Sequence, residues 1–213
     1  MLIQYLLIIF LLMFILLCSM PLDENLIKHL TGSDPKARID YQCGYCNRYV
    51  TGRVLSFYGD NKNLPFIRFM ICPSCLNGSV WKDNIIIPGS KPGENLEGLP
   101  PDVGAAYQEA RNCFSVSAFT GCELLCRKII MHIGVDKGAQ EGQTFASYLD
   151  HLKSKGYITP PIEGWADLIR QFGNQSTHQL IPPDKKRTET TLNFTMVLLR
   201  IIYEMEYKAA KFK

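Results

Sequence analysis

Two pairs of cysteines most strongly constrain the fold of this 213-residue chain. Cys43 and Cys46 form one C-x-x-C pair, and Cys72 and Cys75 form a second, with 25 residues between the pairs. Each pair can supply two thiolates from one tight turn, whose backbone amides can also reach the sulfurs. Because zinc prefers four tetrahedral ligands, the spacing predicts one structural zinc ion. Four sulfur ligands leave no position for water, so a catalytic zinc is not expected.

The residues between the two cysteine pairs have the pattern of a β-hairpin. Residues 48–58, RYVTGRVLSFY, alternate apolar and polar side chains, residues 59–63 form a turn, and residues 64–71, LPFIRFMI, form a second strand. Two knuckles joined by a hairpin resemble a zinc ribbon, placed here at residues 38–87. Four basic side chains could hold a partner or a nucleic acid, with solvated charge as the alternative: Arg48, Arg53, Lys62 and Arg68.

Two disulfide bonds are the competing interpretation of the four cysteines. They would suit a secreted protein, but the paired spacing argues against them, as does an N-terminus without a basic start or a small-residue cleavage site. A redox role for one pair is weaker still, because two matched pairs are present. Three further cysteines lie on apolar helical stripes and are predicted to belong to the core: Cys113, Cys122 and Cys126.

The N-terminal segment is apolar and uncharged from Met1 to Leu22. It is long enough to cross a bilayer core of about 30 Å as a helix. The positive-inside bias would then keep the rest of the chain in the cytoplasm, because basic residues follow: Lys28, Lys36 and Arg38. Alternatively, translation begins at Met20, whose MPLDENLIKHL is an ordinary cytoplasmic start. Residues 1–19 are therefore either a membrane anchor or a mis-called start, and both interpretations place the folded part in the cytoplasm.

Composition and charge narrow the choice of function only slightly. The chain is 46% hydrophobic and 11% aromatic, which is enough for a packed core. Its formal charge of +3 is spread over mixed acids and bases. That bias is too weak to argue for nucleic acid on electrostatics alone.

A loop rich in proline and glycine near residues 88–101 marks the change to a helical period. Apolar stripes then predict five helices, around residues 103–114, 119–133, 145–152, 165–172 and 192–203. Ser117 and Thr144 are predicted N-caps, and Gly156 is a predicted helix end. The chain is thus expected to be an α+β protein, with a small β-hairpin zinc ribbon followed by an all-α five-helix bundle over residues 99–210.

The helical half resembles the domain-of-unknown-function family 4145. The resemblance rests on LPPDVGAAYQEARNCFSVSAFTGCELLCRKII, on WADLIRQFGNQSTH and on a closing apolar helix, and it covers roughly residues 99–205. The residues that match the motifs of the family are Tyr107, Glu109, Ala110, Leu125, Arg127, Gly173, Asn174 and His178. A zinc ribbon in front of such a domain is a familiar arrangement.

This family is similar to the wider HEPN group of helical bundles, many of which are metal-independent ribonucleases in toxin–antitoxin and antiviral systems. The resemblance implies an HEPN-like bundle, an RNA or nucleotide partner, a homodimer, and a context of bacterial defence or a mobile element. The motif of the group is an arginine, usually followed by a polar residue, with a histidine four to six residues beyond the arginine.

In GNQSTH, Asn174 and His178 are in place, but Gly173 stands where the arginine of that motif would be. Histidine suits proton transfer and arginine suits phosphate binding, which metal-free RNA cleavage requires. On a continuous helix, Arg170, Asn174 and His178 would share one face, so these three are the candidate catalytic residues. A helix that stops at Gly173 would break that alignment.

A structural role is the alternative for the same segment. Asn174 could then cap a helix end, and His178 could bond a backbone carbonyl. One further arginine and two further histidines have no other polar residue at a spacing that would indicate a catalytic site: Arg111, His132 and His151. The sequence thus leaves two functions open, an RNA- or nucleotide-associated protein and a non-catalytic, dimerising adaptor. The adaptor would be tethered to the membrane if residues 1–19 are translated.

Overall fold

The computed structural model describes residues 31–32, 36–59, 67–178 and 182–212, with the backbone alone at 31–32 and 173–178. The chain forms two compact units. Of the described residues, one unit contains 31–32, 36–41, 49–59 and 67–86, and the other contains 42–48, 87–178 and 182–212. In the described part, no helix combines the length and apolarity needed to cross a bilayer. The apolar segment 1–19 lies outside the described residues.

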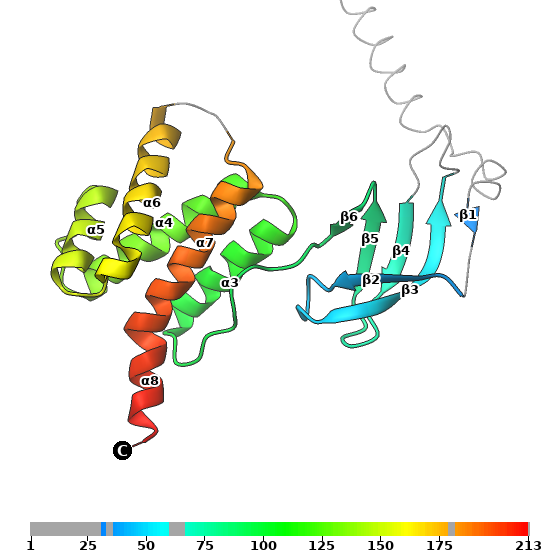
Figure 1. Cartoon of the computed structure of the whole chain (residues 1–213), viewed down its shortest axis with the longest axis horizontal. Coiled ribbons are helices and arrows are strands. Elements are labelled where there is room, and N and C mark those ends of the chain that lie inside the picture. The colour runs from blue at the N-terminus through cyan, green and yellow to red at the C-terminus, as the bar shows by residue number, and fades with distance from the viewer. Residues whose placement is uncertain (1–30, 33–35, 60–66, 179–181, 213) are drawn as a thin grey trace, which may run out of the picture. The chain divides into compact units, whose positions relative to one another are not determined.

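The first unit is built around an antiparallel sheet (Figure 1). Its strands in the described part are β1 (Thr31–Gly32), β2 (Arg38–Gln42), β3 (Tyr49–Tyr58), β4 (Ile67–Ile71), β5 (Gly78–Lys82) and β6 (Ile85–Ile87). The order is β1-β3-β4-β5-β6, and β2 also pairs with β3. The predicted hairpin is therefore the β3–β4 pair of a sheet of six strands, larger than the small ribbon that the sequence predicts.

The two faces of the sheet differ in burial, as period-2 alternation requires. Val54 of β3 is the register partner of Met70 of β4, and both side chains are buried. Gly52 lies on the same buried side, where an added Cβ would come within 2.3 Å of the Tyr41 ring. The alternate positions of β3 are exposed. A register shift between Val54 and Ser56 marks a β-bulge.

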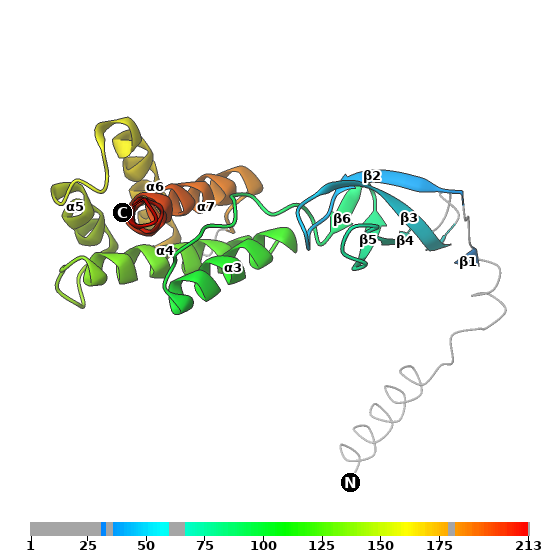
Figure 2. The same ribbon diagram turned by 90° about the horizontal axis from the view of Figure 1, so that it is seen from below.

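The second unit contains the helical bundle. Its helices are α3 (Pro101–Ser115), α4 (Phe119–Asp136), α5 (Phe145–Ser154), α6 (Pro160–His178) and α7 (Lys185–Leu199), which continues through the π-helix η1 (Arg200–Glu204) into α8 (Met205–Ala210). The prediction of five helices is confirmed for the described residues if the last continuous helix is counted once. In Figure 2 the C-terminal end of that helix is seen end-on while α7 runs to the right of it, with α3 and α4 side by side below.

The core of the bundle is apolar and closely packed. Its largest fully buried side chains include Tyr107, Ile130, Ile133, Leu149, Leu152, Ile169, Leu192, Phe194, Leu198, Leu199 and Ile202. Cys122 and Cys126 lie within this core, and Cys113 packs at its edge, which agrees with their predicted role as small apolar side chains.

Two of the three predicted helix boundaries are confirmed. The Thr144 hydroxyl accepts a hydrogen bond of 3.2 Å from the Ser147 N–H and caps α5. Gly156, at a φ of +80°, follows the end of that helix. The prediction for Ser117 is wrong, because Ala118 occupies the N-cap of α4 and no side chain caps it. Ser117 instead takes a φ of +61° in the tight turn after α3.

The loop before α3 is bound to the bundle by its backbone. The Arg111 guanidinium, itself buried, donates to the carbonyls of Pro92 and Gly93 at 3.0 and 3.2 Å and to the Asn95 side chain at 2.6 Å. Gly89 donates its N–H to the carbonyl of Ser115 at 2.7 Å. These bonds satisfy loop carbonyls that would otherwise be buried without partners.

The same loop is also held by the C-terminal helix. Glu204 is buried in η1, and its carboxylate accepts a 3.2 Å hydrogen bond from the Glu97 N–H. Arg200 and Lys208 pair with that carboxylate at 2.9 and 3.1 Å. Burial alone would raise the pKa of Glu204, but these three hydrogen bonds outweigh it and lower the pKa below its ordinary value.

Candidate functional site

The two C-x-x-C segments form turns with the same hydrogen bonds. In the first turn, the Asn47 N–H donates to the Cys43 carbonyl at 2.8 Å. In the second, the Leu76 N–H donates to the Cys72 carbonyl at 2.9 Å. Asn47 and Leu76 both adopt a positive φ, near 60°. The two turns, although distant in the sequence, thus have the same knuckle geometry.

Each turn also directs a backbone amide at a sulfur. The Tyr45 N–H donates to Cys43 Sγ at 3.4 Å, and the Ser74 N–H donates to Cys72 Sγ at 3.4 Å. Hydrogen bonds to a thiolate stabilise its negative charge, and such outer contacts orient and tune metal ligands. These bonds are those that the sequence leads one to expect of two zinc knuckles.

The four sulfurs converge on one point. The Sγ atoms of Cys43, Cys46, Cys72 and Cys75 all lie within 4.8 Å of one another. Tetrahedral zinc, with Zn–S bonds of about 2.3 Å, places its sulfurs about 3.8 Å apart. Cys43 and Cys72 are buried, while Cys46 and Cys75 are half-buried. The donor set therefore fits a structural metal such as zinc, and convergence of all four sulfurs favours a metal over two separate disulfides.

The first knuckle is packed tightly against the start of the loop that leads to α3. A Cβ added to Gly44 would lie 2.4 Å from the carbonyl oxygen of Pro88 and 2.5 Å from that of Gly89. The Lys91 N–H donates to the Asn47 side-chain oxygen at 3.2 Å. Glycine is thus required between the cysteines of CGYC because backbone occupies the space of a side chain.

The second candidate site lies on α6, which begins at Pro160 and runs to His178. The predicted alternative of a helix end at Gly173 is wrong, because the helix continues through it for five more residues. The side chains of Asn174 and His178 lie outside the described residues. The structure therefore describes how their backbone is arranged and does not describe their contacts.

Arg170, the third candidate catalytic residue, is partly exposed on α6. Its Nη2 forms an ion pair with Asp150 of α5. Its Nε is buried, and the described residues offer that atom no hydrogen-bond acceptor. Arg170 is thus oriented by a carboxylate, while its Nε has no partner among the described residues.

Sequence reasoning missed the side chain that contacts α6 at Phe172, the last residue of this helix whose side chain is described. Arg187 of α7 donates from Nη2 to the Phe172 carbonyl at 2.9 Å, and its guanidinium lies 4.8 Å from the centre of the Phe172 ring. Two further bonds of 2.9 Å join Arg187 to Glu123 of α4. In the nearby sequence, Asp184 could have indicated that α7 starts here and that Arg187 lies in its first turn. Asp184 is the N-cap of α7 and accepts a hydrogen bond of 2.8 Å from the Arg187 N–H.

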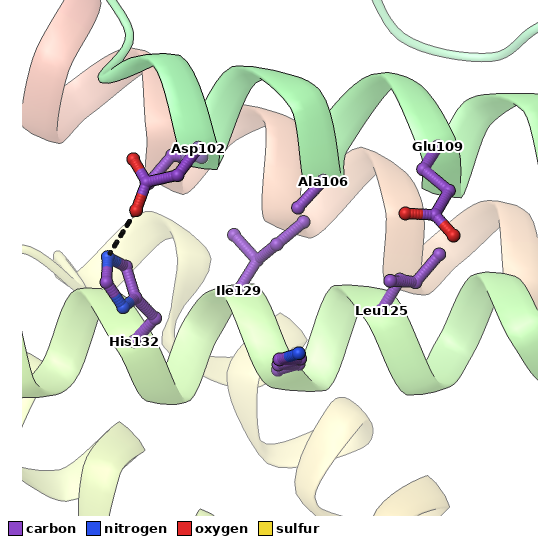
Figure 3. A pocket seen from close by; sticks show the side chains of 8 residues that line it. Asp102, Ala106, Glu109, Leu125, Ile129 and His132 are labelled. Atoms are coloured by element: carbon purple, nitrogen blue, oxygen red, sulfur yellow. Dashed lines mark ion pairs between the residues drawn. The ribbon is translucent and has the colours of Figure 1, made fainter.

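The structure shows polar contacts for the three residues to which the sequence assigned no partner. Arg111 binds the loop before α3, and the His151 Nε2 lies 3.0 Å from the Lys137 carbonyl. His132 of α4 lies 3.6 Å from Asp102 of α3, at one end of a shallow groove of about 270 Å³ between these helices (Figure 3). The floor of the groove is apolar and its rim is charged.

Comparison with known proteins identifies the helical half alone. The model of the family described as "Domain of unknown function (DUF4145)" matches residues 108–213. No curated protein matches the chain, and no solved structure matches it.

Proposed function

Residues 108–213 are a DUF4145 domain, preceded by a β-sheet region with a four-cysteine cluster typical of a zinc ribbon. From that premise we propose that the protein associates with RNA and cleaves it without a metal, through Arg170, Asn174 and His178 of α6. The observation that carries the proposal is the unbroken course of α6 from Pro160 to His178.

The continuous helix matters because it aligns the three residues. Positions four and eight residues after Arg170 lie about 40° and about 80° around an α-helix from it, so Asn174 and His178 fall on one broad face with it. An imidazole with a pKa near 6.5 can take the proton of a ribose 2′-OH or return one to the leaving oxygen. A guanidinium can bind the phosphate oxygens through paired, charged hydrogen bonds.

Asp150 would serve as a positioning residue in this arrangement. Its carboxylate engages one nitrogen of Arg170, and a guanidinium carries five N–H donors. Because Nε is buried, the donors left for a phosphate are those of the two Nη atoms, while Asp150 holds the plane of the group. The Arg187 contact at the Phe172 carbonyl supports the helix where the GNQSTH segment starts.

The zinc ion has a structural role in the proposal. Four thiolates would occupy all four positions of tetrahedral zinc, which leaves none for water or substrate. The reaction is therefore expected to persist in a chelator, provided that the centre keeps its metal. A bacterial defence or mobile-element context belongs to the proposal through the likeness to HEPN proteins. The cytoplasmic side belongs to it through the basic residues that follow the N-terminal apolar segment.

A non-catalytic, dimerising adaptor is the second candidate function. The ion pair between Arg170 and Asp150 favours it, because the Asp150 carboxylate neutralises the positive charge of Arg170 that would otherwise bind a phosphate. An adaptor of this kind would form a stable homodimer and leave RNA intact. The two functions thus differ in what the same preparation does to RNA.

The test is incubation of the full chain, kept in solution with a mild detergent, with mixed cellular RNA in a chelator. Zinc content is measured before and after, so that loss of the metal is detected. His178→Ala and Arg170→Ala are compared with His132→Ala, a control that removes an exposed histidine of α4. Cleavage by the parent and by His132→Ala alone supports the proposal. Intact RNA in all four samples, together with a stable dimer, supports the adaptor.

A further inference from the structure

We infer that the exposed face of the sheet in the first unit binds single-stranded nucleic acid. This face, here called the outer face, is formed by Tyr49, Arg53 and Leu55 of β3 and by Phe69 of β4. The inference adds a binding surface that is separate from α6 and does not depend on cleavage there.

Strand register places these side chains on one face. Arg53 pairs with Ile71, and Ser56 pairs with Phe69, across the β3–β4 ladder. Their neighbours Val54 and Met70 pair on the opposite face, where both are buried. Because successive side chains alternate, Arg53 and Phe69 both point away from that buried side. Tyr49 and Arg53 are four residues apart on one strand and therefore share this orientation.

The large apolar side chains of the outer face are exposed to solvent and do not belong to the core. Tyr49 is 77% exposed, Leu55 50% and Phe69 44%. Phe69 lies level with Ser56, seven residues along β3 from Tyr49, which is a separation of about 23 Å at the rise of a strand. Two rings so spaced could stack different bases of one extended strand.

The charge of the sheet region, together with the exposed rings, favours nucleic acid over an apolar protein surface as the occupant. Residues 36–87 contain seven lysines and arginines against three acids, whereas residues 88–213 contain fifteen against fourteen. The sheet region thus has a formal charge of +4 (seven minus three), or +2 with a zinc–tetrathiolate centre of charge −2, against +1 (fifteen minus fourteen) for the longer helical region. Arg53 is exposed and forms no ion pair with the described residues.

Aromatic rings beside an exposed arginine suit single strands in particular. Bases of a single strand are free to stack on aromatic side chains, while the phosphates meet basic groups. In a duplex the base faces are already stacked on one another and cannot reach Tyr49 or Phe69. The shared chemistry covers RNA and DNA, and a preference for RNA would require contacts to the 2′-OH.

The experiment measures binding of the full chain to a fluorescent 20-nucleotide oligouridine, by anisotropy at fixed salt. An oligothymidine of equal length and an RNA duplex are run beside it. The variants are Tyr49→Ala, Phe69→Ala and Arg53→Glu. Their matched controls are Phe212→Ala, which removes a ring that is 91% exposed on the other unit, and Lys155→Glu, which makes the same charge change there. Zinc content and melting temperature show that each variant is folded.

We expect each aromatic variant to bind the single strand at least about fivefold more weakly, and Arg53→Glu to do the same with a shallower salt dependence. The two controls should bind like the parent, and the duplex should bind less well than the single strand. Equal loss with oligouridine and oligothymidine indicates stacking and phosphate contacts, and loss with oligouridine alone indicates a 2′-OH contact. Both results support the inference.

Two results would overturn the inference. One is no binding of either single strand by the parent, and the other is unchanged binding by folded Tyr49→Ala and Phe69→Ala. If these variants instead lose a protein partner while nucleic-acid binding is unchanged, the outer face is a protein-docking surface. The oligothymidine arm separates this inference from the proposed function, because a strand without 2′-OH groups can bind the outer face but cannot be cut by the reaction proposed for α6.

Discussion

Arg187 of α7 and Glu123 of α4 form a two-pronged ion pair, with both N–H···O distances at 2.9 Å and both side chains largely buried. The same guanidinium stacks on Phe172 and donates to its carbonyl. One side chain therefore joins α4, α7 and α6 just before the GNQSTH segment.

Removal of either partner should destabilise the bundle, because the other charge would stay buried without compensation. We expect Arg187→Ala or Glu123→Ala to lower the free energy of unfolding by about 3–5 kcal/mol, measured by urea titration. Lys153→Ala breaks an exposed pair with Glu163 and is expected to change stability little. Equal effects of Arg187→Ala and Lys153→Ala would show that the buried pair is not a major support.

Protein purified under reducing conditions without chelator should contain one zinc ion per chain by elemental analysis. Cys43→Ser and Cys72→Ser should lose the ion, because each removes one of four convergent sulfurs. Cys113→Ser should retain it, since Cys113 packs at the edge of the helical core. A parent protein that contains no metal would argue against the zinc ribbon.

Gly44→Ala should disturb the first knuckle. The new Cβ would lie 2.4 Å from the Pro88 carbonyl oxygen, so backbone must move, at a cost of about 1–3 kcal/mol in stability. Gly164→Ala in α6 meets nothing within 4 Å and should stabilise the helix by roughly 0.5–1 kcal/mol. Thermal denaturation of the two variants tests the contrast, and a Gly44→Ala protein as stable as the parent would refute the packing account.

The buried carboxylate of Glu204 should make stability depend on pH in the acid range. Its folded pKa is lowered by its hydrogen bonds, so the ionised form stabilises the fold above the ordinary pKa of about 4.3. That contribution is lost as the pH falls through the lower, folded value. Glu204→Gln should therefore be less stable than the parent at pH 7, and the difference should shrink on acidification. A difference that stays constant from pH 7 to pH 3 would contradict this role.

Local spacing predicted those features whose determinants lie close together in the sequence. The knuckles follow from C-x-x-C turns, the cap of α5 from Thr144, and the helices from apolar stripes of period 3.6. The prediction failed at Ser117, because the tight turn there takes a positive φ that composition does not reveal.

Contacts between distant segments were not predictable in the same way. Arg187 and Glu123 are 64 residues apart, and Glu97 and Glu204 are 107 apart. The size of the sheet was also missed. The residues of β2, RIDYQ, do alternate polar and apolar side chains, but the predicted strands were placed only between the two cysteine pairs. The three isoleucines of β6 show no alternation at all. Gly173 was ambiguous because glycine both ends helices and is tolerated within them, at about 1 kcal/mol relative to alanine.

The most direct test of the proposed function is cleavage of one RNA oligonucleotide in chelator, beside a copy that lacks every 2′-OH. Attack by the 2′-OH requires that group, so the account predicts that the parent cuts only the ribose form. His178→Ala, with an unchanged melting temperature and zinc content, should cut neither. Cleavage of the deoxy copy, equal cleavage by His178→Ala, or no cleavage of the ribose form would contradict the account.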